Sequence, residues 1–150
     1  MLTDLHRAVG WTARNISTFG GDPNNIHLLG QSAGAHLAVQ CLIEKAEEEG
    51  GVCLSEHPKF KIEKHEASMW RLSNIKQCIA ISGLYEIAIE AAHLHDRGLY
   101  KHVLYVIMEG ELSCFSPTRR VVHPLFQVSC ELRCEVELTL LEMCTFTSTN

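Results

Sequence analysis

A serine flanked by glycines is the residue of this chain best placed to do chemistry. It is Ser32, in the run Gly30-Gln31-Ser32-Ala33-Gly34. A serine hydroxyl is a poor nucleophile unless it is held exposed and close to a base. The Gly-x-Ser-x-Gly spacing meets the first condition, because it is typical of a sharp strand-to-helix turn that presents the serine above a sheet. We therefore predict Ser32 as a catalytic nucleophile, with Gly30, Gln31 and Gly34 forming the turn and the two glycines letting strand and helix approach.

The residue after this serine is expected to stabilise negative charge. Ser32 precedes a predicted helix, whose first N–H groups lack partners and whose dipole favours an anion. The N–H of Ala33 is therefore a candidate for half of an oxyanion hole. His36, four residues after Ser32, is a candidate base, but the turn directs the serine away from its own helix. We expect His36 to pack or to form a local hydrogen bond.

The sequence around the serine supplies the elements that such a turn needs. Residues 26–29 are a short apolar run bounded by turn residues, which predicts a strand, and residues 35–49 have apolar side chains at helical spacing. Residues 3–18 predict an amphipathic helix capped by Thr3 and followed by a turn over residues 20–25. This alternation of helix, strand, tight turn and helix predicts an α/β fold with a parallel sheet and flanking helices.

Further elements follow along the chain. Residues 78–82 predict a second strand that ends at Gly83, and residues 85–95 and 99–109 predict helices separated by Gly98. A new segment begins at Ser116-Pro117. Residues 131–140 alternate charged and apolar side chains, which suits another strand. The charged stretch of residues 47–67 predicts a surface connector.

Composition excludes several classes of function. The chain has 150 residues, 46% hydrophobic and 21% charged, with a net charge of −5. Its basic residues are scattered, so we expect no nucleic-acid partner. No run approaches the roughly 20 apolar residues of a membrane helix, and no secretory leader is predicted at the N-terminus. The seven cysteines are expected to be reduced and structural, and the nearest pair, Cys130 and Cys134, is not expected to bind a metal.

Several blocks of sequence resemble a known family. The segments on either side of the turn are similar to the esterase/lipase family, and Gln31 with His36 brings the likeness closer to plant isoprenylcysteine methylesterases. The resemblance spans roughly residues 5–118, with a divergent insert at 48–67, and these runs carry it: Phe19-Gly20-Gly21-Asp22-Pro23-Asn24-Asn25-Ile26, Leu28-Leu29-Gly30-Gln31-Ser32-Ala33-Gly34-Ala35, Arg97-Gly98-Leu99-Tyr100, Met108-Glu109-Gly110-Glu111 and Phe115-Ser116-Pro117.

The resemblance implies both a fold and an activity. It implies a partial α/β-hydrolase domain over residues 1–120, followed by a divergent C-terminal tail over residues 121–150. It also implies hydrolysis of the methyl ester of a prenylated C-terminal cysteine, with a prenylated protein or prenylcysteine methyl ester as partner and no metal or organic cofactor. The family is located at endoplasmic reticulum and Golgi membranes, and plant members are linked to abscisic acid signalling. The family's oxyanion loop and membrane segment are expected before residue 1.

The acid and the base that would activate the serine are not identified in this sequence. The fold orders its triad as Ser, then Asp or Glu, then His, and the family's motifs for the last two do not follow Ser116-Pro117. Asp96 is the sole aspartate after Ser32, but the resemblance matches it to a helical position and not to the catalytic acid; His123 is the last histidine and could be offered as the base. We expect the other candidates to be structural or superficial: Asp4, Asp22, His93, His95, His102, Tyr85, Tyr100 and Trp70.

This incomplete triad leads to one expectation and leaves alternatives open. Loss of the base costs many orders of magnitude in rate, so we expect these 150 residues by themselves to be a weak esterase or inactive. A general carboxylesterase with a different acyl pocket is one alternative to the prenylcysteine methylesterase. A non-catalytic product that acts only by binding is another, because an incomplete sheet has open edges that favour association.

Overall fold

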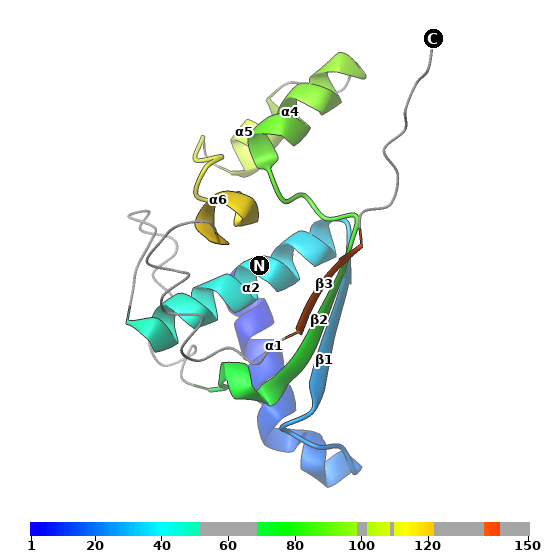
Figure 1. The fold of residues 1–150 in the computed structure, drawn as a ribbon, viewed down its shortest axis with the longest axis vertical. Helices are drawn as coiled ribbons and strands as arrows, with labels where there is room; N and C mark the ends of the chain where they lie inside the picture. Colours follow the sequence, from blue (N-terminus) through cyan, green and yellow to red (C-terminus); the bar gives the residue numbers. More distant parts are fainter. Residues whose placement is uncertain (52–68, 99–101, 109, 122–136, 142–150) are drawn as a thin grey trace.

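Three parallel strands form the sheet of the computed structural model, which describes residues 1–51, 69–98, 102–108, 110–121 and 137–141. They are β1 (Ile26–Gln31), β2 (Ile75–Ile81) and β3 (Glu137–Leu141), in that spatial order. Gln31 pairs with Ile81, and Ile81 pairs with Leu141. The carboxyl ends of all three strands therefore meet at one edge of the sheet (Figure 1). The predicted parallel α/β arrangement is confirmed.

Two helices cover one face of this sheet. They are α1 (Leu2–Asn15), extended by a short 3-10 helix at Ile16–Phe19, and α2 (Ala33–Gly50) (Figure 1). Parallel neighbours need a crossover connection, and α2 lies within the crossover from β1 to β2. A second short 3-10 helix, Leu72–Asn74, precedes β2.

The main core lies between α2 and the sheet. Six of the apolar residues whose helical spacing predicted this helix are buried: Ala35, Ala38, Val39, Leu42, Ile43 and Ala46. They pack with Ile75, Cys78 and Ala80 of β2 and with Trp70. Burial raises the pKa of the Cys41 thiol, and it raises that of Cys78 to about 11. Both thiols are therefore protonated near neutral pH, and none of the three described cysteines forms a disulfide.

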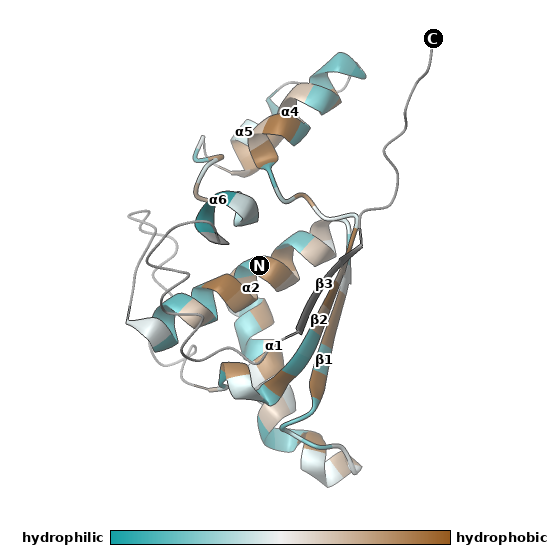
Figure 2. Ribbon diagram, viewed as in Figure 1, coloured by the Kyte–Doolittle hydropathy of each residue, from teal (hydrophilic) through white to brown (hydrophobic). Residues whose placement is uncertain are grey.

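A second, smaller core lies beyond the carboxyl edge of the sheet. The chain leaves β2 and forms α4 (Ile87–Asp96), α5 (Val103–Ile107) and α6 (Pro117–Val121). Figure 1 shows α4 and α5 above the strand ends and α6 beside α2. In Figure 2 the apolar residues of α4 and α5 form brown bands on their ribbons. The buried members of this core are Ile87, Ala91, Leu104, Met108 and Leu112.

The structure corrects several expectations about element boundaries. The first helix begins at Leu2 with Met1 as its N-cap, so the predicted Thr3 cap is wrong. Its buried face includes His6 and Gly10, whereas Ala8 is exposed. Gly10 is required there, because a Cβ at this position would lie 2.7 Å from the Cβ of Met69. The second strand starts three residues earlier than predicted. Of the helix predicted over residues 99–109, the described residues include the helical segment α5.

The predicted connector and tail are described only in part. Residues 47–50 belong to the last turns of α2, so the connector does not begin at Glu47, and residues 52–67 lie outside the described residues. In the tail, Glu137–Leu141 forms β3 as the alternation of residues 131–140 predicted, while residues 122–136 and 142–150 lie outside the description. No helix in the described ranges is long and apolar enough to cross a membrane.

Candidate active site

Ser32 occupies the single residue between β1 and α2. Its backbone has φ 54° and ψ −121°, which an L-residue rarely adopts. Such a conformation costs on the order of 1–3 kcal/mol and persists only where the surroundings impose it. Here the Ser32 N–H donates to the Ile81 carbonyl at 2.9 Å, and the Ser32 carbonyl accepts from the His36 N–H at 3.1 Å. The sheet and the helix therefore hold the serine from both sides.

Gly30 lets the strand and the helix approach each other. A Cβ at this position would lie 2.4 Å from the Gly34 carbonyl oxygen and 2.6 Å from the Ala35 nitrogen. Since both are backbone atoms, no side chain fits there without moving the helix. A Cβ at Gly34, by contrast, would meet no described atom within 4 Å. The prediction that small residues bring strand and helix together therefore holds for Gly30 alone within the described chain.

The Ser32 hydroxyl lies at the surface. Gln31, Ser32, Ala33 and Gly34 are all exposed, although Ala35 next to them is fully buried. The hydroxyl makes no capping bond to α2 and no hydrogen bond to any other described residue. The first N–H groups of α2, including that of Ala33, point out of the helix end without intrahelical partners. An anion beside Ser32 would therefore meet backbone donors and the positive end of the helix dipole.

His36 forms a local bond, as predicted. Its ring is buried, and Nδ1 lies 2.6 Å from the Leu84 carbonyl oxygen. Because a carbonyl only accepts, Nδ1 carries the proton and donates it. Burial lowers the pKa of His36, and the nearby Arg120 lowers it further, although the bond to Leu84 acts in the opposite direction. The side chain thus joins the first turn of α2 to the loop that follows β2.

The other titratable candidates lie apart from the serine hydroxyl. Asp4 lies in the first turn of α1, Asp22 accepts the Asn24 N–H in the turn before β1, and Asp96 ends α4. His93 and His95 of α4 and His102, just before α5, are exposed. No group of three metal-ligating side chains occurs among the described residues. Four of the titratable candidates named above lie outside the description: Tyr100, His123, Cys130 and Cys134.

Sequence reasoning missed a second strained serine beside the first. Ser82 follows β2 directly, has φ 49° and is exposed. It and Ser32 are the only non-glycine residues with positive φ in the described ranges. An apolar strand followed by Ser-Gly is an ordinary strand ending, so the pattern carried no signal for a left-handed serine. Its position at the same edge is what makes it notable.

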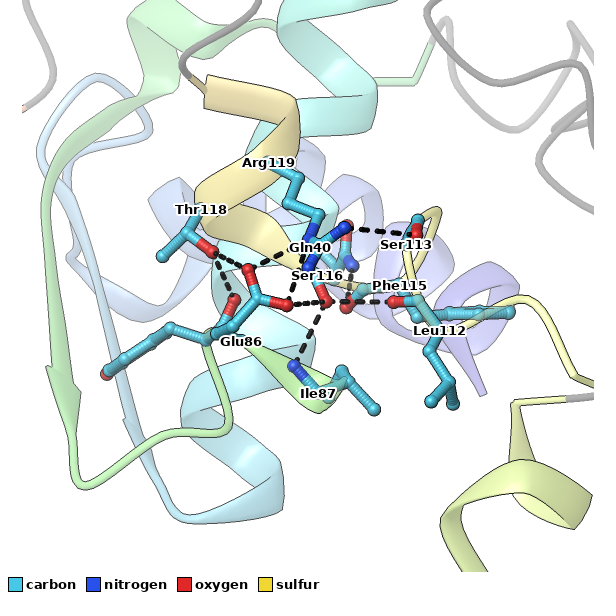
Figure 3. Close-up of polar contacts among 10 residues, drawn as sticks. Gln40, Glu86, Ile87, Leu112, Ser113, Phe115, Ser116, Thr118 and Arg119 are labelled. Atoms are coloured by element: carbon cyan, nitrogen blue, oxygen red, sulfur yellow. Dashed lines mark hydrogen bonds and ion pairs between the residues drawn. The ribbon is translucent and has the colours of Figure 1, made fainter. Parts of the chain in front are cut away.

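The loop after Ser82 is held by a network centred on Glu86. Figure 3 shows Thr118 and Arg119 of α6 converging on the Glu86 carboxylate, with Thr118 Oγ1 at 3.0 Å and Arg119 Nε at 2.9 Å. The hydrogen bond from Arg119 is the main reason that the pKa of Glu86 is lowered. Buried Ser116 accepts the Ile87 N–H at 3.0 Å and donates to the Leu112 carbonyl at 2.8 Å. These bonds fix the beginning of α4 against α6.

Comparisons with known proteins agree with this geometry. Residues 1–57 match the Carboxylesterase family. Over 83% of its length the chain is 41% identical to the isoprenylcysteine alpha-carbonyl methylesterase ICME of Arabidopsis thaliana, and it is 37% identical over 83% to the probable enzyme ICMEL1 of rice, Oryza sativa subsp. japonica. It covers 27% of each of these relatives, about a quarter of their length.

A more distant likeness is confined to a shorter stretch. The chain is 48% identical over 62 residues to the human bile salt-activated lipase, which covers 36% of this chain and 8% of the lipase. No solved structure matches. The Carboxylesterase match implies an α/β-hydrolase fold, of which the three strands and their helices form a part. The resemblance seen in the sequence is confirmed: over most of its length the chain is similar to proteins named isoprenylcysteine alpha-carbonyl methylesterases.

Proposed function

We propose that Ser32 is the nucleophile of a carboxylic-ester hydrolase. The observation that carries this proposal is an exposed serine at φ 54° between a parallel strand and a helix. In this reaction Ser32 Oγ attacks the ester carbonyl carbon and gives its proton to a base. The Ala33 N–H donates to the oxyanion of the tetrahedral intermediate. The alcohol then leaves, and water hydrolyses the acyl-enzyme to release the acid and free Ser32.

The relatives suggest which ester is cleaved. We propose the methyl ester of a prenylated C-terminal cysteine, because several relatives at 34–41% identity carry the name isoprenylcysteine alpha-carbonyl methylesterase. The partner would then be a prenylated protein or a prenylcysteine methyl ester. The endoplasmic reticulum and Golgi location and the link to abscisic acid signalling, both implied by the sequence resemblance, form part of the same proposal.

A general carboxylesterase is the second candidate function. The stretch that resembles the bile salt-activated lipases supports it, since the name of these proteins does not refer to prenylcysteine. Comparing turnover of a prenylcysteine methyl ester with that of a simple alkyl ester, in a form of the protein that is active, separates the two. The methylesterase proposal predicts the higher kcat/KM for the prenylcysteine ester.

A fluorophosphonate probe tests the role of Ser32. Such probes phosphonylate serines according to how strongly they are activated, so at a large excess of probe we expect slow labelling of the 150-residue chain that is specific for Ser32, read by intact mass and peptide mapping. Ser32→Ala should abolish the label, whereas Ser73→Ala, which changes an exposed serine at the opposite end of β2, should leave it unchanged. An unlabelled wild-type chain would instead support a non-catalytic product that acts by binding.

Turnover is expected to be weak even where labelling succeeds. No described side chain contacts the Ser32 hydroxyl to serve as a base, and a triad without its base loses many orders of magnitude in rate. We expect hydrolysis of a p-nitrophenyl ester by these 150 residues at or near background. Rapid turnover that disappears in Ser32→Ala would contradict this expectation and place a base within the chain.

A further inference from the structure

Ser82 lies beside the proposed nucleophile at the carboxyl edge of the sheet. The register pairs Gln31 with Ile81, so Ser32 and Ser82 each follow the last residue of two neighbouring strands. The Ser32 N–H donates at 2.9 Å to the Ile81 carbonyl, which belongs to the peptide unit that joins Ile81 to Ser82. Neighbouring strands lie about 4.8 Å apart, so the two serine backbones are separated by about that distance. Ligands of open parallel sheets bind at this edge.

The turn that carries Ser82 is anchored on both sides. Before it, the Ile81 carbonyl is held by Ser32. After it, the Leu84 carbonyl accepts from His36 Nδ1 at 2.6 Å, and the Tyr85 carbonyl accepts from the Thr118 N–H at 3.2 Å. The Tyr85 ring also lies against Gly83, where a Cβ would come within 2.6 Å of it. The hydroxyl is therefore presented from a rigid support, as a substrate contact requires.

The Ser82 hydroxyl plays no part in holding the described fold together. Its side chain is exposed, and its hydroxyl forms no hydrogen bond with another described residue. A left-handed position favours glycine, asparagine or aspartate, so serine gains nothing there from local structure. Strained residues of this kind cluster at functional sites. An unpaired hydroxyl next to a nucleophile is a ready hydrogen-bond partner for substrate.

We propose that Ser82 selects the acyl part of the substrate by accepting a hydrogen bond from the amide N–H on the carbon next to the scissile carbonyl. This inference rests on the proposed function of Ser32. An ester poised for attack has its carbonyl carbon about 3 Å from the serine oxygen, so groups two bonds away reach the end of the adjacent strand. A methoxy group carries no donor. The amide N–H of a C-terminal cysteine is the donor nearest to the reacting carbon.

Binding of two matched esters tests the proposal. N-acetyl-S-geranylcysteine methyl ester carries the amide, and the methyl ester of S-geranyl-3-mercaptopropionic acid lacks only the acetamido group. We expect the 150-residue chain, titrated with each ester by NMR, to bind the first about fivefold more tightly, the effect of one hydrogen bond. Ser82→Ala and Ser82→Gly should both remove this preference. Glycine also relieves the backbone strain at this position, whereas alanine does not. If Ser82 acted only through its backbone conformation, the two variants would therefore differ in their preference.

The controls decide between the failure of this inference and the failure of the proposed function. Ser73→Ala should keep the preference, because Ser73 lies at the opposite end of β2. Equal affinity of the wild type for both esters, or a preference that persists in Ser82→Gly, would overturn the role of Ser82 and leave Ser32 unaffected. If neither ester bound the wild type, the methylesterase proposal would fail and this inference with it.

Discussion

His36 is the residue that joins the proposed nucleophile to the rest of the edge. It lies one helical turn after Ser32 and is buried. Its Nδ1 donates to the carbonyl of Leu84, which lies two residues after Ser82. Both serine turns therefore depend on one neutral imidazole. Because burial outweighs the hydrogen bond, the charged form is disfavoured in the folded protein and the pKa of His36 is lowered from its usual value near 6.5.

This lowered pKa predicts a loss of stability in acid. The unfolded chain binds a proton at His36 at a higher pH than the folded chain, so stability rises with pH across this interval. The stability that depends on neutral His36 is fully present above about pH 6.5, and it is lost as the pH falls toward the lowered pKa of the folded state. The slope from this group is at most about 1.4 kcal/mol per pH unit.

His36→Gln should flatten this part of the pH profile, because glutamine can still donate to Leu84 but does not titrate. Urea unfolding of both proteins at several values between pH 5 and pH 7.5 measures the effect. We expect the wild type to lose more stability than the variant as the solution is acidified. Parallel profiles would show that His36 is not the group responsible.

At the scale of elements, α2 carries a buried polar row beside its apolar stripe. Gln40 Nε2 donates to the Phe115 carbonyl at 2.7 Å, and Arg120 of α6 binds both Gln40 and Glu47. The Arg120 Nη2 to Glu47 Oε1 distance is 2.7 Å, with 5% and 8% of the two side chains exposed. Between Gln40 and Glu47 in the sequence lies Glu44. It binds His6 of α1, whose Nδ1 accepts from Trp70 Nε1. Polar contacts therefore dock α1 and α6 onto the same helix.

Arg120→Leu should be strongly destabilising, because it leaves the buried Glu47 carboxylate without this partner. Breaking a buried ion pair from one side typically costs about 3–5 kcal/mol, whereas replacing both partners by apolar residues is often neutral. We expect the double variant Arg120→Leu/Glu47→Leu to recover most of the loss in urea unfolding. Arg119→Leu is the matched control, since its pair with Glu86 is more exposed and should cost under about 1 kcal/mol. Equal losses from Arg119 and Arg120 would contradict the argument from burial.

The sequence predicts those features that depend on neighbours along the chain. The apolar stripe of α2 follows from periodicity, β1 and β2 follow from short apolar runs, and the turn at Ser32 follows from the Gly-x-Ser-x-Gly spacing. The features that the sequence did not predict depend on residues far away along the chain. His6 is buried because it meets Glu44, 38 residues away, and Trp70, 64 residues away. Glu47 reads as part of a charged surface stretch until Arg120, 73 residues away, is placed beside it. Ser82 is strained by the turn that tertiary contacts impose, which no local propensity encodes.

At the scale of the whole molecule, the described sheet is covered on one face only. Both α1 and α2 lie on the same side, and Figure 1 shows no described helix on the other. Side chains alternate along a strand, so Leu29 and its neighbour Ile79 face away from the core that holds Leu28 and Cys78. Leu29 is 70% exposed. Parallel sheets are ordinarily covered on both faces.

We expect these 150 residues to self-associate through the face of the described sheet that carries Leu29, because association removes the apolar side chains from water. Leu29→Lys should shift the chain toward monomer, since a charge on this face of the sheet must be desolvated to pack. Light scattering after size-exclusion chromatography, over a range of protein concentrations, measures the shift. Val106→Lys on α5 is the control, because Val106 is similarly exposed, at 73%, and lies in the upper helices away from the sheet. If only the Val106 variant became monomeric, the contact would be made by the upper helices, and the open face of the sheet would play no part in it.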